Sequence, residues 1–365
     1  MRKTLLSAAV ALTAAIATAT AGPATNQRKT NDAKEAALAT ISIDAAKAHI
    51  GFLASDELRG RKAGTNDAQV AAQYIIAHLR EWGIKPLADQ LPAADSCCKG
   101  APRPSRPTMN DSYTQPFSAY SMEWQKRKPW YVEPDSVAKL TAGTHRRLDM
   151  KNVLAMIPGR RSDEYVVVGA HFDHVGDDPS LVGDKVYNGA DDNASGVSAA
   201  LQIARAFAAS GVQPERNVVF AFWDGEELGL LGSRRFMLDC PFADKIKGYL
   251  NFDMIGRNNK PENPPYVVYF YTAAHPVFGD WFKGDIKRYK LNLDPDYRAW
   301  DNPVGGSDNG TFAKRGIPII WYHTDGHPDY HQPGDEAEKI NYEKVADITR
   351  AAFLNAWNLA NEKTY

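Results

Sequence analysis

The stretch YVVVGAHFDH, residues 165–174, runs an apolar segment directly into histidine and aspartate side chains. Its first part, residues 165–170, is short and rich in Val, which is typical of a strand buried on both faces. His171 and Asp173 follow at the point where such a strand would end. The stretch therefore predicts a buried strand with polar side chains at its carboxyl end.

Four further apolar runs share this character, at 152–157, 217–223, 248–252 and 317–322. Between and after these runs lie amphipathic segments at 194–210 and 342–360, and Gly211 ends the first of them. Strands that alternate with helices indicate an α/β domain. We expect a mostly parallel, mixed central sheet with helices on both faces.

The residues before the first strand predict two helices and an irregular segment. One helix is expected to be capped by Asp44, and another spans 66–82 and ends at Gly83. Prolines are frequent between about residues 86 and 147. We expect this segment to be a loop or an insertion, with short strands at 113–117 and 137–140.

The beginning of the chain has the three-part layout of a secretory signal peptide. Arg2 and Lys3 precede an apolar stretch, and Ala19-Thr20-Ala21 forms a cleavage site. We expect a signal peptide at 1–21, a flexible mature N-terminus at 22–40 and one domain at 41–365. The protein would then be exported, either to the periplasm or out of the cell.

Composition is ordinary for a globular protein, with 44% hydrophobic and 24% charged residues in 365. Without Arg2 and Lys3 the formal net charge moves from −1 to −3. This balance gives no reason to expect nucleic acid, or a membrane after signal removal, as a partner. The three cysteines, Cys97, Cys98 and Cys240, leave the disulfide pattern open.

Metal-binding residue types gather after the other predicted strands as well. They are Asp224, Glu226 and Glu227, then Asp253, and finally His323, His327 and His331. Ligands of open α/β sheets bind outside the carboxyl ends of the strands. Imidazole and carboxylate groups suit zinc, with manganese or cobalt as possible substitutes, and two such ions can share a bridging carboxylate. The pattern predicts metal-assisted hydrolysis.

Five segments resemble the co-catalytic dizinc peptidases: GAHFDH at 169–174, GADDNASG at 189–196, WDGEELG at 223–229, NFDMIG at 251–256 and DYHQP at 329–333. That superfamily includes secreted leucyl aminopeptidases, glutamate carboxypeptidases, glutaminyl cyclases and transferrin receptors. The resemblance runs from about Leu53 to the C-terminus, in the order of the family. It implies a zinc exopeptidase-like fold.

The resemblance also implies a set of metal ligands. His171 and Asp253 would bind one metal, Glu227 and His331 would bind the other, and Asp192 would bridge both. This set implies two Zn²⁺ per chain. A cis peptide bond is expected after Asp192.

Three further residues receive catalytic roles. Glu226 resembles the general base of the family, and Tyr330 matches a tyrosine that stabilises the oxyanion in some relatives. Asp173 lies two residues after His171, so the two side chains share a strand face and Asp173 can hold the far ring nitrogen of His171.

Nearby polar residues are expected to have lesser roles. Asp191 would cap the helix that begins near Ala194. His174, His323 and His327 would lie at the rim of the site or form ordinary hydrogen bonds. Where relatives carry Ser-Asp-His, this chain has Ser307, Asp308 and Asn309.

The expected activity is hydrolysis of the N-terminal peptide bond of peptides with a free N-terminus, through a metal-bridging water and with Glu226 as general base. Three alternatives stay open. A metallocarboxypeptidase would need cations for the substrate carboxylate, for which the sequence offers Arg257, Arg288, Arg298 and Lys314. A glutaminyl cyclase, which is an acyltransferase, would use one metal. A non-catalytic binding ectodomain would be expected to have lost metal ligands or the base.

Overall fold

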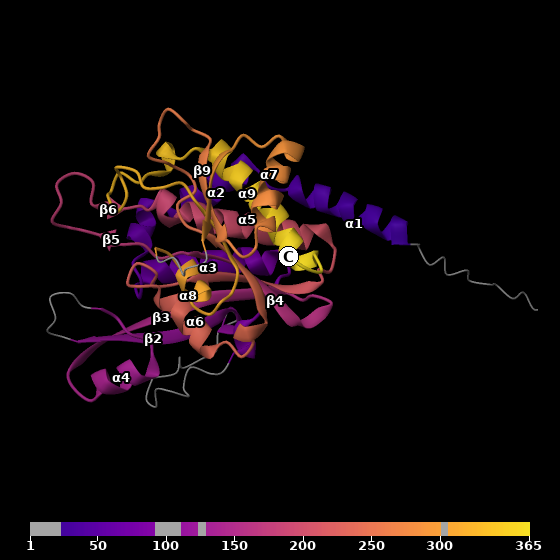
Figure 1. The fold of residues 1–365 in the computed structure, drawn as a ribbon. Coiled ribbons are helices and arrows are strands. Elements are labelled where there is room, and N and C mark those ends of the chain that lie inside the picture. Colours follow the sequence, from indigo (N-terminus) through magenta and orange to yellow (C-terminus); the bar gives the residue numbers. More distant parts are fainter. Residues whose placement is uncertain (1–22, 92–110, 123–128, 301–305) are drawn as a thin grey trace, which may run out of the picture.

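The computed structural model describes residues 23–91, 111–122, 129–300 and 306–365 (Figure 1). The expected signal peptide at 1–21 lies outside the described residues, as do Cys97 and Cys98. Cys240 is a free and buried thiol.

The centre of the protein is one mixed sheet with the strand order β1-β3-β7-β4-β8-β11-β9-β10, in which β2 pairs with β3. Its four middle strands are parallel: β7 (Arg216–Trp223), β4 (Arg161–His171), β8 (Ile246–Phe252) and β11 (Ile319–His323). Antiparallel pairing joins β3 (His145–Ile157) to β7, and β9 (Tyr266–Thr272) to β11. The predicted fold class is therefore confirmed.

Helices cover both faces of the sheet because alternate strand residues are apolar on both sides. Val166 and Val168 of β4 belong to a core shared with α2 (Ile43–Leu53), α3 (Asn66–Glu81), α5 (Gly196–Ser210) and α9 (Tyr342–Asn361). Val167 faces the other way, into a core shared with α6 (Leu231–Asp239) and α8 (Asn309–Ala313). Every residue of β7 is buried, as expected for a strand at the centre of three layers.

The sheet extends beyond the strands predicted from the sequence. β10 (Asp294–Trp300) runs parallel to β9 at one edge, and α7 (Val277–Tyr289) connects the two. At the other edge, β1 (Lys85–Pro86) pairs with β3. A small separate hairpin joins β5 (Gly176–Asp177) to β6 (Val186–Tyr187).

The expectation of a flexible segment at 22–40 differs from the structure, which forms helix α1 over Pro23–Leu38. Ala37 and Leu38 at its end are buried in the main core, and this packing favours an ordered helix. The next helix is capped by Ser42, whose hydroxyl accepts from the amide of Ala45, and not by Asp44. Asp44 lies inside the first turn.

The irregular segment contains more regular structure than expected. β2 (Thr114–Met122) pairs with β3 along its whole length, in place of a shorter strand at 113–117. The strand expected at 137–140 is wrong, because α4 spans Pro134–Thr141. Pro134 favours the first turn of a helix, and Val137 packs inward from it.

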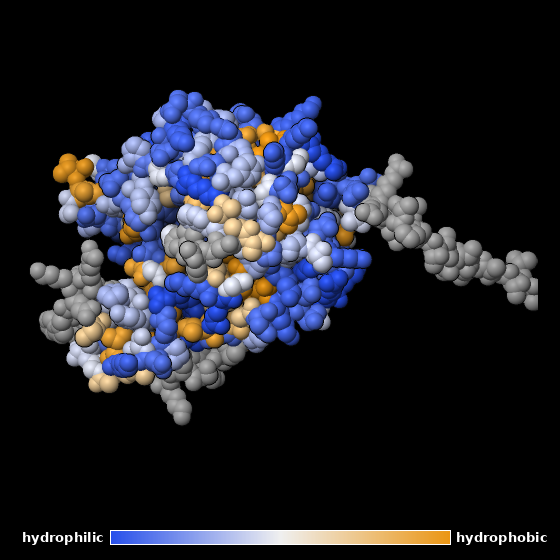
Figure 2. Space-filling view, in the orientation of Figure 1, coloured by the Kyte–Doolittle hydropathy of each residue, from blue (hydrophilic) through white to orange (hydrophobic). Residues whose placement is uncertain are grey.

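The outer surface is mainly hydrophilic on the face seen in Figure 2, with smaller apolar patches between the polar side chains. In the described parts of the chain, no single helix is long and apolar enough to cross a membrane. The bent pair Thr30–Leu38 and Ile43–Leu53 reaches that length and composition together. Ile50 and Leu53 of this pair are buried in the core.

Candidate metal centre

The predicted ligands come from separate loops at the carboxyl ends of the parallel strands. His171 is the last residue of β4, Asp253 follows β8, and Glu227 lies in the turn after β7. Asp192 belongs to the irregular turn Ala190–Ser195 that precedes α5, and His331 follows β11. The peptide bond between Asp192 and Asn193 is cis, as the sequence resemblance implied. The fold thus brings these five residues to one edge of the sheet.

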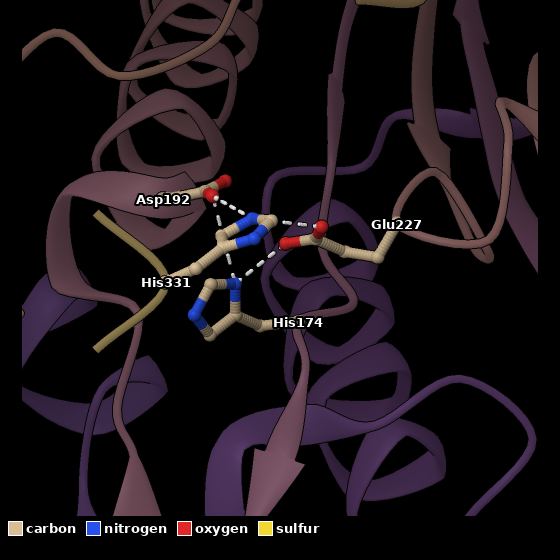
Figure 3. Close-up of side chains that lie close together, drawn as sticks. All are labelled: His174, Asp192, Glu227 and His331. Atoms are coloured by element: carbon tan, nitrogen blue, oxygen red, sulfur yellow. Dashed lines mark hydrogen bonds and ion pairs between the residues drawn. The ribbon is translucent and has the colours of Figure 1, made fainter. Parts of the chain in front are cut away.

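Their side chains form two adjoining pockets that share Asp192. In the first, here called the Asp253 pocket, His171 Nε2 lies 3.3 Å from Asp192 Oδ1 and 3.6 Å from Asp253 Oδ1. In the second, called the Glu227 pocket, His331 Nε2 lies 3.1 Å from Asp192 Oδ2 and 3.0 Å from Glu227 Oε2 (Figure 3). The two oxygens of Asp192 therefore face different pockets.

Both pockets fit a divalent metal ion. Tetrahedral zinc holds nitrogen and oxygen ligands at about 2.0–2.2 Å, which places neighbouring ligand atoms about 3.3 Å apart. The distances in both pockets fall around this value. Nε2 of His171 and Nε2 of His331 are buried, and neither has a hydrogen-bond partner among the described residues. A bound cation would be coordinated by the lone pairs of these two Nε2 atoms together with the neighbouring carboxylate oxygens.

The carboxylates and imidazoles of the two pockets shift each other's pKa values toward the charged forms. Burial lowers the pKa of His171, but the carboxylates of Glu226 and Asp253 outweigh it and raise that pKa well above its usual value. Burial likewise opposes ionisation of Asp192, yet His174 and other imidazoles hold its pKa well below the usual range. Against burial, Asp192 and Glu227 raise the pKa of His331 to about 10. A bound metal would take the place of these protons.

Glu226 lies close to His171, beside the Asp253 pocket. Its Oε2 lies 4.0 Å from His171 Nε2, and its side chain is 12% exposed. Burial raises the pKa of Glu226 well above its usual value, and the nearby carboxylates of Asp253 and Asp308 add to this effect. A carboxylate with a raised pKa can both accept and return a proton near neutral pH.

Asp173 holds the Glu226 turn more directly than it holds His171. Its Oδ1 accepts from the backbone amide of Glu226 at 3.0 Å, and its Oδ2 accepts from that of Glu227 at 3.3 Å. His171 Nδ1 lies 3.2 Å from the Asp173 carbonyl and 3.7 Å from its carboxylate. The expected contact with the far ring nitrogen is therefore made by the backbone oxygen, which leaves Nε2 facing the pocket.

Asp335 has the same role for the Asp192 turn and was missed in the sequence. Its buried carboxylate accepts from the amides of Asp191 and Asp192 at 3.0–3.1 Å. Asp191 does not cap α5 as expected, because its carboxylate accepts from the amides of Gly256 and Arg257. It therefore holds the loop that follows Asp253.

Arg61 is a buried cation behind the acidic cluster, also missed in the sequence. It is 1% exposed and donates to the carbonyls of Phe172, Asn188 and Gly189. Burial lowers its pKa to about 10, although Asp192 and Asp335 oppose this shift. The side chain thus offsets part of the negative charge while it ties together the backbone on both sides of the site.

The remaining histidines lie close to the pockets but differ in their contacts. His174 Nδ1 lies 2.7 Å from Glu227 Oε1, so His174 is not a rim residue (Figure 3). His323 Nδ1 lies 2.6 Å from the carbonyl of Asp253. His327 is buried, 3.4 Å from the Asp191 carboxylate. Asn309, at the position that departs from the family pattern, is buried and lies 3.5 Å from Asn251 of β8.

A cavity of about 280 Å³ opens beside the Asp253 pocket. It is lined by Asp192, Glu226, Asp253, Met254, Gly306, Trp321, His323, Gly326 and Tyr330. Tyr330 is 46% exposed and stacks on His331 with ring centroids 4.0 Å apart. The described lining thus combines three carboxylates with Met254, three aromatic side chains and two glycines.

The chain is similar to known peptidases in both sequence and fold. It is 34% identical over 170 residues to leupeptin-inactivating enzyme 1 of Streptomyces exfoliatus, covering 46% of this chain and 34% of that protein. It is 33% identical over 175 residues to an aminopeptidase of Pseudomonas aeruginosa, covering 47% and 30%. The chain therefore spans about a third of the length of these curated relatives.

A zinc aminopeptidase from Bacillus subtilis, BSAP, has a similar fold, with a TM-score of 0.60 at 14% identity. The likeness covers 89% of this chain and 97% of that structure. The family model described as peptidase family M28 matches residues 152–355, which is more than half of the chain and includes every predicted metal ligand. The chain belongs to peptidase family M28.

Proposed function

We propose that this protein is an exported zinc aminopeptidase with two metal ions at the shared centre. His171 and Asp253 would hold one ion, Glu227 and His331 the other, and Asp192 both. The observation that carries this proposal is the pair of pockets facing the two oxygens of Asp192, with Glu226 beside them. Zinc bound there would supply Lewis acidity for the attack of water on a peptide carbonyl.

The residues of the chain would carry the proton and orient the substrate. Glu226 would accept a proton from the attacking water and pass one to the leaving amine, a use favoured by its raised pKa. Tyr330 belongs to the lining of the cavity, and its hydroxyl would donate to the oxygen that gains charge. Asp173 would keep Glu226 and Glu227 in place through their backbone amides.

The cavity supports an aminopeptidase over a carboxypeptidase. Its described lining includes three carboxylates and no arginine or lysine. The cations that a carboxypeptidase would need are engaged elsewhere: Arg257 pairs with Asp329, Arg288 with Glu35, and Arg298 with Asp296 and Asp325. Lys314 is exposed and does not belong to the described lining. A free substrate amine fits this acidic wall better than a carboxylate does.

Two other functions are less favoured. A glutaminyl cyclase would need one metal, whereas each of the two pockets here holds at least one histidine, its own carboxylate and a share of Asp192. A binding ectodomain would not need Glu226 in the cavity wall. Export rests on the signal-peptide pattern at 1–21, and the similarity to an aminopeptidase of Pseudomonas aeruginosa supports peptidase activity.

The test is a peptide panel on the purified mature protein. It compares free and N-acetylated dipeptides, C-terminally amidated peptides, and peptides that begin with Gln, each with zinc and after chelation. Release of the first residue from free peptides alone, lost on chelation, is expected. Cleavage of N-acetylated peptides but not of amidated ones would instead identify a carboxypeptidase, and ammonia from Gln peptides would identify a cyclase.

A further inference from the structure

We propose that His174 is a positioning residue for the metal centre, which orients Glu227 and so makes the Glu227 pocket the tighter of the two zinc sites. This inference rests on the proposed zinc centre. His174 is 1% exposed and lies three residues after His171, beyond the end of β4. It thus lies beside the ligands without belonging to the predicted set.

The two carboxylate oxygens of Glu227 contact different histidines, His331 and His174 (Figure 3). Its Oε2 lies 3.0 Å from His331 Nε2, in the pocket shared with Asp192. Its Oε1 lies 2.7 Å from His174 Nδ1. One oxygen of Glu227 therefore contacts His331, while the other contacts His174, whose Nδ1 also lies 3.7 Å from Asp192 Oδ2. A ligating carboxylate held in this way is oriented before the metal arrives, which favours binding.

The imidazole of His174 is itself tightly fixed. Its backbone amide donates to the carbonyl of Arg61 at 3.2 Å. Gly189, whose φ is +61°, lies against the ring, and a Cβ there would come within 2.6 Å of His174 Cδ2 and 2.2 Å of the Asp192 carbonyl. Only glycine fits between the ring and the Asp192 backbone, so the ring has little freedom to turn.

The tautomer follows from the second ring nitrogen. Nε2 of His174 is buried and has no hydrogen-bond partner among the described residues. A proton on Nε2 would be an unsatisfied buried donor, which costs more than an unused lone pair. The proton therefore belongs on Nδ1, where it is donated to Glu227 Oε1. With this proton in place, Nδ1 is not available as a metal ligand.

The Asp253 pocket has no equivalent support. Among the described residues, no hydrogen bond reaches the carboxylate of Asp253, and its contact with His171 is at 3.6 Å. Asp253 also borders the cavity, whereas Glu227 does not belong to its described lining. The two pockets are thus unequal: the carboxylate of Glu227 is oriented by His174, whereas the carboxylate of Asp253 has no such partner among the described residues and lies next to the substrate space.

The experiment measures stepwise zinc binding to the full mature protein at pH 7.5 by competition with a chromophoric chelator. The variants are His174→Ala, which removes the donor, and His174→Asn, whose amide can donate from nearly the place of Nδ1. The control is His49→Ala, which removes another buried histidine that contacts a side-chain oxygen, that of Tyr74 at 2.9 Å. Circular dichroism of the metal-free forms checks folding.

We expect two zinc affinities in the wild type. His174→Ala should weaken the tighter step by about 10–100-fold and leave the other unchanged, because it removes a partner that orients one ligand. His174→Asn should recover most of that loss, and His49→Ala should have no effect on either step. In a Glu227→Ala background, His174→Ala should change nothing further.

Several results would overturn the inference. They are an unchanged tighter step in His174→Ala, equal weakening of both steps, or a His174→Asn variant no better than His174→Ala. The last result would indicate direct ligation or packing. Zinc binding is measured without peptide. A protein that binds zinc in two steps but cleaves no peptide would contradict the aminopeptidase proposal and leave the inference about His174 standing. A wild type that does not bind zinc in two steps would contradict both the proposed function and the inference about His174.

Discussion

The Oδ1 atom of Asp173 accepts a hydrogen bond from the backbone amide of Glu226 at 3.0 Å, while its other oxygen accepts from the next amide. One buried carboxylate thus fixes two consecutive peptide units of the turn after β7. Asp335 does the same for the amides of Asp191 and Asp192. The two turns that carry the proposed metal ligands Glu227 and Asp192 are therefore each held by a carboxylate from another loop.

Asp173→Asn should lower kcat by about 10–100-fold, in the range observed when partners of metal-site groups are removed. An amide can offer one acceptor oxygen, but its NH₂ group would face an amide donor of the turn. The measurement is kcat together with bound zinc per chain. Asp149→Asn, at a side chain that is 65% exposed on β3, is the matched control and should retain full activity. A mutant as active as this control would show that the turn holds its shape without Asp173.

Asp335→Asn should weaken zinc binding in both pockets, since Asp192 contributes an oxygen to each. We expect a loss of about tenfold or more per ion, again because a group that orients a ligand is impaired. Equilibrium dialysis against buffered zinc gives both affinities. If only one ion were affected, Asp335 would act on something other than the shared carboxylate.

The sequence predicts the position of a site residue when that residue directly follows a recognisable strand. His171, Glu226, Glu227 and Asp253 each follow an apolar run that predicts a buried strand, so their common edge follows from the α/β pattern. Asp335 receives no role from the sequence, and His174 only that of a rim residue or an ordinary hydrogen bonder, because their partners lie far along the chain: Asp335 and Asp192 are 143 residues apart. Such contacts depend on loop geometry, which periodicity does not report.

The missed elements have a similar explanation. β10 lies at the sheet edge and has a charged residue at every second position from Asp294 to Arg298, so it lacks the continuous apolar run of a central strand. α4 packs against β2, and one buried valine is too little for a helical pattern to emerge from eight residues. The early segment 23–38 is polar over most of its length, and only its end reaches the core.

Glu226→Gln should abolish most turnover while zinc stays bound. The amide has nearly the same shape but cannot accept a proton from water, and loss of a general base typically costs about 10²–10⁴-fold. The test compares kcat with zinc content in the same preparation. Wild-type turnover in a fully loaded mutant would remove Glu226 from the mechanism, whereas lost zinc would point to a role in metal binding.

Tyr330→Phe should lower kcat with little change in KM. The ring would still stack on His331, so the substitution removes the hydroxyl and leaves the packing. Loss of one donor to the developing oxyanion typically costs about 10²–10³-fold in kcat. Steady-state kinetics on one free-amine dipeptide provide the measurement. An increase in KM with kcat unchanged would instead assign Tyr330 to substrate binding.

His49 makes the stability of the fold depend on pH at a place remote from the metal centre. Burial, together with the nearby His78 and Arg205, lowers its pKa from 6.5 to about 3. Above pH 6.5 His49 is neutral in both the folded and the unfolded chain, so it adds no pH dependence. Between pH 6.5 and 3 only the unfolded chain takes up this proton, and the free energy of unfolding falls as the pH falls.

We therefore expect the wild type to lose about 2–3 kcal/mol more than His49→Phe when the pH is lowered from 7 to 4.5. Phenylalanine can still pack against Tyr74 and Trp82 but cannot be protonated. Chemical denaturation at both pH values gives the two differences in the free energy of unfolding. Tyr74→Phe removes only the hydroxyl that contacts His49 at 2.9 Å and should keep the pH dependence of the wild type. Equal losses in the wild type and in His49→Phe would mean that His49 is protonated in the folded protein, because a histidine that ionises equally in both states contributes nothing to the slope.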